Sequence, residues 1–389
     1  MKRAYDVIVV GCGGIGGAAA YWLGRELHSD VLALEQFRLG HDHGASQDHS
    51  RIIRLCYHLP EYTALTPHTY TAWAEVEAES GVQLVVKTGG LDISAAGSDT
   101  YDLYAGAMRA AAIPFEELSA ADVMAAYPQW RLDGDERALY QADSGLVDAR
   151  KANATHIALA RASGATILDE TPVHSVRATP DGVEVDTPAG TFGARRLVVA
   201  ADAWTNHVLG SLGIQWPLTV TQEQVTYYAT PHLRQFAPDR FPIWIWHGAD
   251  ILYGFPIYGE IATKAGVDVG GETVTHDTRT FEPNPRAHQR LHGFLERHIP
   301  DSVGPILYTK TCLYTMPPDR NFVIDTLAEA GYPQIIVAQG AGHAFKFASL
   351  LGQILRDLAL RGETTFPISP FTASRPAITD PSYPPSFTM

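Results

Sequence analysis

The residues best suited to chemistry are cations that lie among apolar residues. Arg51 and Arg54 flank two isoleucines, and Lys264, Gly266 and Asp268 alternate along a run of β-forming residues. Alternate residues of a strand point to the same face, so the last three would lie together, with open space beside the glycine. We expect this face to line a cavity. The alternative is a solvent-exposed strand edge that carries a pair of opposite charges.

Arginines in apolar sequence need an anion to face. If the Arg51–Arg54 segment formed a helical turn, both side chains would lie on one side of it. A structural salt bridge would satisfy either arginine equally well. The histidines and aspartates of the preceding loop, residues 41–49, alternate in a Gly- and Ser-rich stretch without a second cluster, so we expect no metal site.

A strand, a glycine-rich turn and a helix are predicted at the N-terminus. The apolar run of residues 7–10 leads into G-x-G-x-x-G, with Gly11, Gly13 and Gly16 as its glycines and Ile15 between the last two. Such glycines permit a tight turn, close approach of a pyrophosphate, and packing of helix on strand, while the helix N-terminus attracts the anion. Glu35 ends the next apolar run and could accept the ribose hydroxyls. This pattern indicates a dinucleotide site, for either NAD or FAD.

A second strand-to-helix transition lies near the C-terminus. The predicted strand at residues 334–338 passes through Gly340, Gly342 and His343 to Lys346 and an amphipathic helix that ends before Gly362. This helix start offers a second dipole to an anion. Between the two glycine-rich turns the chain alternates short strands and helices, with a three-stranded excursion at 166–201 and an aromatic, strand-rich stretch at 217–311. An NAD-only dehydrogenase would continue with βαβ units instead.

Composition limits the partners. The 389 residues carry 29 Lys and Arg against 43 Asp and Glu, and the resulting charge of −14 argues against nucleic acid. No apolar run approaches the length needed to cross a bilayer, so we expect no membrane partner. Three scattered cysteines favour a reducing, cytoplasmic location over a disulfide framework.

The motifs occur in an order that resembles the monomeric sarcosine oxidase and N-methyltryptophan oxidase family. The resemblance runs from about residue 5 to residue 378. Its motifs are the N-terminal glycine turn, S-R-I-I-R at 50–54, Y-G-F-P at 253–256 with Lys264, C-x-Y-T at 312–315, D-x-x-F-V-I-D at 319–325 and G-x-G-H-x-F-K-F at 340–347.

The resemblance implies an α/β (α+β) fold. A Rossmann-type FAD-binding domain of the p-hydroxybenzoate-hydroxylase and glutathione-reductase-like class would carry a sheet-rich substrate domain. We expect the FAD domain to comprise residues 1–85, 145–217 and 312–378, and the substrate domain residues 86–144 and 218–311. Residues 379–389 would be an extended C-terminal tail. The family also implies a monomer.

The resemblance further implies an oxidase that converts a secondary amino acid, N-methylated or cyclic, to an imine while O2 becomes H2O2. FAD would be attached through Cys312. Lys264 would serve the reaction with O2, Arg54 and Lys346 would hold the substrate carboxylate rather than pair with a structural acid, and Arg51 would face the flavin. The remaining cofactor contacts would come from Ser50, Val173, Gly340, Gly342, His343 and Lys346. The alternatives are an NAD(P)-dependent dehydrogenase and a non-catalytic flavin-binding protein.

Two departures from the family pattern bear on the site. Asp202 replaces a glycine in the strand-end motif at 201–204, and Asp268 stands where sarcosine oxidases carry a histidine. Asp268 could bind the protonated amine, share charge with Lys264, or do both. Trp244 and Tyr253 would provide flat apolar walls. We therefore expect cyclic or bulky secondary amino acids to be preferred over sarcosine.

Overall fold

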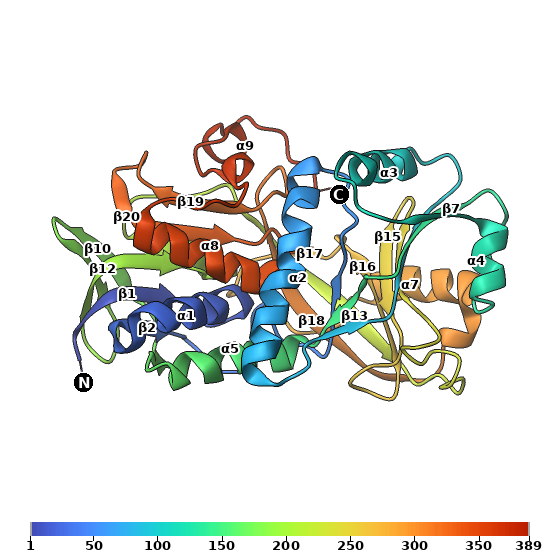
Figure 1. The fold of residues 1–389 in the computed structure, drawn as a ribbon, viewed down its shortest axis with the longest axis horizontal. Coiled ribbons are helices and arrows are strands. Elements are labelled where there is room, and N and C mark those ends of the chain that lie inside the picture. The colour runs from blue at the N-terminus through green and yellow to red at the C-terminus, as the bar shows by residue number, and fades with distance from the viewer. Residues whose placement is uncertain (1, 388–389) are drawn as a thin grey trace.

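The computed structural model describes residues 2–387 and contains two large sheets (Figure 1). Within those residues, eight strands form the sheet that begins with β1 (Ala4–Val10), and β1 lies parallel between β2 (Val31–Leu34) and β12 (Phe192–Val199). The free edge of β12 is shared, because β11 (Gly182–Asp186) pairs with its start and β20 (Tyr332–Gln339) pairs in parallel with its end. The other members of this sheet are β9 (Thr166–Leu168), β10 (Ser175–Thr179) and β19 (Val323–Leu327).

Four helices pack into one hydrophobic core beside this sheet. They are α1 (Gly14–Leu27), α2 (Pro60–Ser80), α5 (Ala149–Ala162) and α8 (Ala348–Arg361). Gly352 allows α8 to approach α1, since a Cβ there would lie 2.7 Å from the Ala18 backbone. In Figure 1 these helices lie with the first sheet on the left, and α2 runs down the junction with the second sheet.

The second large sheet fills the other half of the molecule (Figure 1). Its nine strands within the described residues run in the order β17-β13-β16-β15-β14-β5-β7-β6, and β18 pairs with β13. Their bounds are β5 (Gly90–Ser94), β6 (Glu116–Ser119), β7 (Arg137–Gln141), β13 (Thr219–Tyr228), β14 (Ile243–His247), β15 (Ile251–Phe255), β16 (Thr263–Asp268), β17 (Glu272–Val274) and β18 (Ile306–Met316). The helices of this half are α3 (Thr100–Ala110), α4 (Ala120–Ala126) and α7 (Pro285–His298).

A third, small sheet is formed by segments from the N-terminal half of the chain. β8 (Gly145–Val147) pairs with both β3 (Arg51–Ile53) and β4 (Val85–Lys87). The helical turn considered for the Arg51–Arg54 segment is therefore wrong, because β-branched isoleucines extend into a strand here. The remaining elements of the described residues are the short helices α6 (Thr205–Gly210) and α9 (Pro376–Thr379) and the 3₁₀ turns at 28–30, 202–204, 300–302, 345–347 and 369–371.

The mixed α/β fold is confirmed. The strands of the two large sheets come from the two sets of segments assigned to the two domains, except that β18 crosses the boundary placed between residues 311 and 312. The division into an FAD domain and a substrate domain itself stays a prediction. In the part of the chain that the structure describes, no helix combines the length and the apolar character needed to cross a membrane.

The C-terminal tail does more than cover the surface. After α9 it has no regular structure beyond a turn at 381–382, and it returns to the body of the molecule at its end. The backbone carbonyl of Phe387 accepts a hydrogen bond of 2.9 Å from Arg320 Nη1, and the amide of Ser386 donates to Pro318. The tail is thereby fixed beside the segment that precedes β19.

Candidate functional site

One pocket brings together residues from the ends of both large sheets. Tyr253, Lys264 and Asp268 from β15 and β16 face the same space as the glycine turns. Most of the residues singled out in the sequence line it: Gly11, Gly13, Ile15, Glu35, Arg51, Arg54, Val173, Tyr253, Lys264, Asp268, Cys312, Gly340, Gly342, His343 and Lys346. Three do not: Gly16, Ser50 and Trp244.

The first glycine turn has the shape required for a pyrophosphate. A Cβ on Gly11, whose φ is +94°, would come within 2.4 Å of the Ala200 carbonyl oxygen. Gly16 lies under the turn, where a Cβ would lie 1.9 Å from the Gly11 carbonyl, so this glycine allows helix to pack on strand instead of lining the pocket. The amide of Gly14, at the start of α1, donates 2.8 Å to Ser46 Oγ.

Glu35 lies at the end of β2 with its carboxylate held in place. It accepts hydrogen bonds from the amides of Cys12 at 2.9 Å and Phe37 at 3.0 Å, and His41 Nε2 lies 3.3 Å away. Burial alone would raise the pKa of Glu35, but the His41 and amide hydrogen bonds lower it overall. The group is therefore an ionised acceptor, as binding of ribose hydroxyls requires.

The second glycine turn closes the pocket from the side of β20. Gly342 has a φ of +79°, and a Cβ there would lie 2.7 Å from the Tyr314 ring. The chain then passes through the 3₁₀ turn at 345–347 into α8, which ends at Gly362 with a left-handed φ of 78° as predicted. Both glycine turns, each of which leads into a helix, therefore line the same pocket. Together with the Glu35 carboxylate they fit a dinucleotide.

Cys312 lies in β18, where Glu223 of β13 is its cross-strand partner. It is unpaired and partly exposed to the pocket. Burial raises the pKa of its thiol to about 11, and the charge of Arg51 acts in the opposite direction. The arginine is the cation that would favour a thiolate here.

Lys264 does not pair with Asp268. Its Nζ lies 2.6 Å from Asp48 Oδ2 and donates to the carbonyl oxygen of Ser50 at 2.7 Å. Burial lowers the pKa of Lys264 to about 8, although Asp48 raises it. Ser50 therefore lies behind the lysine rather than on the pocket wall, and the shared charge considered for Lys264 and Asp268 is wrong because each has a nearer partner.

Asp268 pairs with Arg320 instead. Both carboxylate oxygens accept from Arg320 Nη2, at 2.8 and 2.9 Å, and the arginine is almost fully buried. The carboxylate keeps some exposure to the pocket, with 16% of the side chain accessible. The arginine fixes the orientation of the acid that faces a ligand.

Arg54 has a structural acid, contrary to expectation. Its Nη1 donates to Asp92 Oδ1 in β5, and both side chains are 4% exposed. His247 Nε2 lies 3.1 Å from the same oxygen. A charge buried this deeply needs a permanent counter-ion. Arg54 still lines the pocket, but the substrate would not be its only anion.

Lys346 has no such counter-ion among the described residues. Its Nζ donates to the Tyr57 hydroxyl at 2.8 Å and to the His343 carbonyl at 3.0 Å. Burial and then the charge of Arg54 lower the pKa of Lys346 to about 7. Arg54 and Lys346 face the same Tyr57 ring, at 5.0 and 5.3 Å from its centroid. An anion that entered here would meet both cations.

Trp244 is not a wall of the pocket. It is 2% exposed and packs against Trp130 and against Phe294 of α7, on the far face of the sheet. Its neighbours in β14, Ile245 and His247, point into the pocket. The prediction that Trp244 lines the pocket is therefore wrong by one position, because the side chains of a strand alternate between its two faces and Ile245 faces the pocket instead.

The backbone conformation of Asp202 is one that glycine adopts more readily. Its φ is +46°, a left-handed value that costs energy for a residue with a side chain. The side chain lines the pocket and contacts Thr315 and Gln339, and none of residues 2–387 places a cation beside it. Burial raises the pKa of this carboxyl to about 6.

The charged partners Asp48, Asp92 and Arg320 were missed. Asp92 had a visible signal, since an acid inside the apolar strand Gly90–Ser94 implies a buried cation. Arg320 follows Asp319 in a recognised motif but was given no role. Asp48 was noted only as one of several polar loop residues. Asp92 and Arg320 lie far in sequence from their partners, and Asp48 lies far from Lys264 although it is only three positions from Arg51, with which it also pairs.

Comparison with known proteins was consistent with this geometry. The model of the DAO family, described as FAD dependent oxidoreductase, matches residues 6–358. A monomeric sarcosine oxidase of Streptomyces avermitilis is 36% identical over 387 residues, covering 96% of this chain and 98% of its own. The N-methyl-L-tryptophan oxidase of Escherichia coli is 30% identical over 378 residues, covering 95% and 99%.

A solved structure extends the comparison to three dimensions. A mutant of NikD, described as an unusual amino acid oxidase essential for nikkomycin biosynthesis, superposes with a TM-score of 0.86 at 28% identity. It covers 95% of this chain and 97% of its own. Glycine oxidase of Geobacillus kaustophilus, at 20% identity and a TM-score of 0.80, shares the fold.

Proposed function

Since the chain belongs to the FAD-dependent oxidoreductase family and is a flavin-dependent amine oxidase, we propose that it oxidises a cyclic or bulky secondary amino acid. The observation that carries this proposal is the convergence of Arg54 and Lys346 on the Tyr57 ring, in a pocket that Tyr253, Ile245 and Asp268 also line. A carboxylate, an amine and an apolar ring would each meet a suitable group there.

The glycine turns, Glu35 and Val173 would hold the FAD. When bound, the flavin supplies the chemistry of hydride acceptance from the substrate carbon and of electron transfer to O2. We propose that it is attached through Cys312, which faces the pocket close enough to Arg51 for that charge to act on the thiol. Acid-precipitated protein should keep its yellow colour and the mass of FAD, whereas Cys312→Ser should lose both. An unmodified mass from wild-type protein that is yellow when native would exclude the attachment.

Lys346 would bind the substrate carboxylate, assisted by the free edge of Arg54. A substrate carboxylate at this point would supply the counter-ion that Lys346 lacks. It would thereby raise the pKa of Lys346 and favour the protonated, charged form. Arg54 contributes less than a free arginine would, because Asp92 already accepts from its Nη1. Arg54→Ala would therefore combine weaker substrate binding with an uncompensated Asp92.

Asp268 would orient the substrate amine. Its carboxylate is held by Arg320 and remains partly exposed to the pocket. Opposite charge favours binding of the protonated amine, which must then lose a proton before hydride leaves the carbon. Tyr253 and Ile245 would flank the substrate side chain, and their apolar surface suits a ring better than a single methyl group.

Lys264 would serve the half-reaction with oxygen. Its ammonium lies in the wall of the pocket, where a fixed positive charge would stabilise negative charge as it develops on O2. Lys264→Met should slow reoxidation of the flavin by orders of magnitude and leave reduction by substrate nearly unchanged. A mutant that reoxidised at the wild-type rate would contradict this role.

A substrate panel tests the proposal as a whole. We expect kcat/KM, measured through peroxide release, to be higher for pipecolate, proline or N-methyltryptophan than for sarcosine. Asp268→His is the matched variant, and it should shift the preference towards sarcosine. Sarcosine as the best of the four substrates would refute the argument from the pocket walls.

Two expectations beyond the site are also proposed. The names of the sarcosine oxidase relatives support a monomer. The three unpaired cysteines support the cytoplasmic location predicted from the sequence. Light scattering of the purified protein and fractionation of cells would test them.

A further inference from the structure

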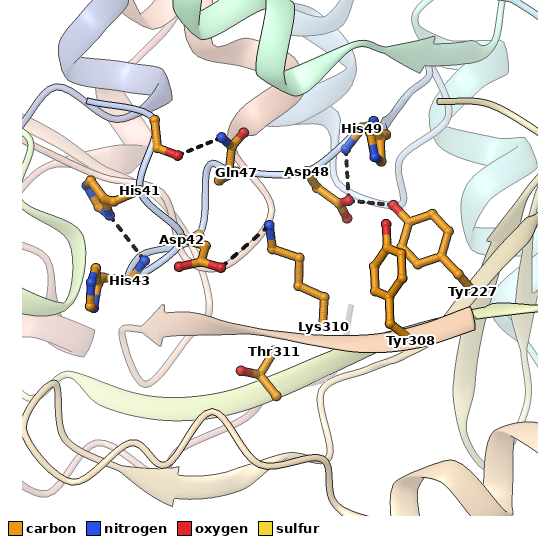
Figure 2. A network of polar contacts seen from close by, with 12 residues as sticks. His41, Asp42, His43, Gln47, Asp48, His49, Tyr227, Tyr308, Lys310 and Thr311 are labelled. Carbon is orange, nitrogen blue, oxygen red and sulfur yellow. Dashed lines mark hydrogen bonds and ion pairs between the residues drawn. The ribbon is translucent and has the colours of Figure 1, made fainter. Parts of the chain in front are cut away.

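Asp48 occupies the centre of a polar network that the proposed reaction has not used. Its Oδ2 lies 2.6 Å from Lys264 Nζ and 3.0 Å from Arg51 Nη1, while Oδ1 accepts from the amide of His49 at 2.8 Å and from the hydroxyl of Tyr227. Figure 2 shows Asp48 on its loop with the Tyr227 hydroxyl directed at it. Asp48 and Lys264 are each 3% exposed.

The surroundings fix Lys264 completely. Its three N–H donors have three acceptors, which are Asp48 Oδ2, the Ser50 carbonyl at 2.7 Å and Ser50 Oγ at 3.2 Å. The ammonium also lies near the rings of Phe255 and Tyr227, at 4.4 and 5.8 Å from their centroids. Lys264 therefore offers the pocket a charge at a fixed point rather than a free hydrogen-bond donor.

Burial opposes that charge. An ammonium surrounded by rings and backbone loses its proton easily, and the pKa of Lys264 is lowered to about 8 even with Asp48 present. Arg51 lowers it further, whereas Asp48 and Cys312 raise it. The pKa of Asp48 itself is well below its usual range because Lys264 and Arg51 outweigh its burial. Without Asp48, the two cations would face each other uncompensated.

We propose that Asp48 is a positioning residue that keeps Lys264 protonated and fixed in the pocket wall during the reaction with O2. This inference rests on the role proposed for Lys264. The other titratable groups that face Asp48 are Tyr227 and Tyr308, Lys310 and Cys312. Figure 2 shows Lys310 turned to Asp42 and the two tyrosines side by side, so none of them replaces the carboxylate.

The decisive experiment compares wild type with Asp48→Asn across pH. Stopped-flow reoxidation of the reduced enzyme should slow in wild type as pH rises through about 8, because Lys264 then loses its proton. In Asp48→Asn the same transition should move down by at least about one pH unit, with at least about a fivefold loss of rate at pH 8. Reduction by substrate should change little.

Three variants make the comparison specific. Asp48→Glu keeps the charge and should restore most of the wild-type profile. Tyr227→Phe removes one hydrogen bond to Asp48 but no charge, and its transition should stay within a few tenths of a pH unit. In a Lys264→Met background, Asp48→Asn should change reoxidation by less than about threefold, because the lysine through which it acts is gone.

A second measurement does not depend on turnover. With 13C-labelled lysine, the Lys264 resonance is identified by its loss in Lys264→Met, and its titration is followed by NMR. We expect a midpoint near 8 in wild type and a lower one in Asp48→Asn. Should the mutant fail to fold, a wild-type midpoint below about 6 would refute the inference by itself.

The outcomes separate the two proposals. Reoxidation of Lys264→Met at the wild-type rate would remove the role of the lysine. A slow Lys264→Met together with identical profiles and midpoints for wild type and Asp48→Asn would retain that role and reject Asp48 as its positioning residue.

Discussion

At the scale of single residues, the two buried lysines of the pocket differ in what surrounds them. Lys264 has a carboxylate at 2.6 Å, whereas the described part of the chain gives the Lys346 ammonium only the Tyr57 hydroxyl and a backbone carbonyl as acceptors. A cation without a counter-ion in an apolar site is ready to receive an anion. This difference is the physical reason to assign the charge of Lys264 to oxygen and the charge of Lys346 to the substrate carboxylate.

The first prediction is that carboxylate binding weakens as pH rises. Burial lowers the pKa of Lys346 to about 7, so its charge is lost above that pH and the affinity for an anion falls. A bound carboxylate raises this pKa in return. The dissociation constant of cyclopentanecarboxylate, followed by flavin absorbance, should rise between pH 7 and 9. Lys346→Met should bind it weakly at every pH, and a flat wild-type curve would contradict the assignment.

The second prediction is that Asp202→Gly stabilises the protein. Glycine removes the cost of a left-handed φ, about 1 kcal/mol, and also removes a buried carboxyl. Because burial raises the pKa of Asp202 to about 6, its contribution to stability is present at low pH and is lost as pH rises through 6. The increase in Tm should be larger at pH 8 than at pH 5. Equal melting temperatures for both proteins at pH 8 would count against it.

At the scale of elements, the two faces of β14 have different roles: one packs in the hydrophobic core and the other lines the pocket. Trp244 and Trp246 belong to the hydrophobic cluster under α7, while Ile245 and His247 face the pocket. A single strand thus contributes to the core with one face and to the substrate site with the other.

The third prediction follows from this alternation. Ile245→Phe narrows the pocket and should lower kcat/KM for bulky substrates about tenfold more than for sarcosine. Trp244→Phe should cost about 1–3 kcal/mol of unfolding free energy and leave the order of substrates unchanged. Thermal unfolding and the substrate panel measure the two effects. A changed substrate order in Trp244→Phe would show that the far face also shapes the site.

At the scale of the whole molecule, the site depends on segments from every part of the chain. Asp268 of β16 is held by Arg320, and Arg320 donates in turn to the carbonyl of Phe387 in the tail. The tail therefore supports Asp268, which we propose to orient the substrate amine, without lining the pocket itself.

The fourth prediction concerns this tail. A chain that ends at Pro385 leaves the buried Nη1 of Arg320 without its acceptor, which costs about 1–3 kcal/mol and loosens Asp268. We expect KM for amino-acid substrates to rise several-fold while flavin content stays the same. Phe387→Ala keeps the carbonyl and should leave KM within about twofold. A KM unaffected by the truncation would show that Asp268 needs no support from the tail.

The family and most of the elements could be predicted from the amino-acid sequence alone. The start of helix α7 is determined locally, because Asn284 caps its first amides and Pro285 is suited to its first turn. The glycine turns are likewise local, since their spacing sets both the backbone conformation and the start of the helix. The ordered motifs added the flavin-dependent amine oxidase activity.

Most of the buried ion pairs could not be predicted in this way, because they form between segments that are distant in sequence. Arg54 pairs with Asp92 and Asp268 with Arg320, across sequence separations of 38 and 52 residues. Lys264 pairs with Asp48 rather than with the acid four positions away on its own strand. Local periodicity places a side chain on one face of a strand, but it contains no information about which loop packs against that face. The same limit explains why the sequence pointed to Trp244 instead of Ile245 as a pocket residue. A strand that is buried on both faces shows no polar face in its sequence.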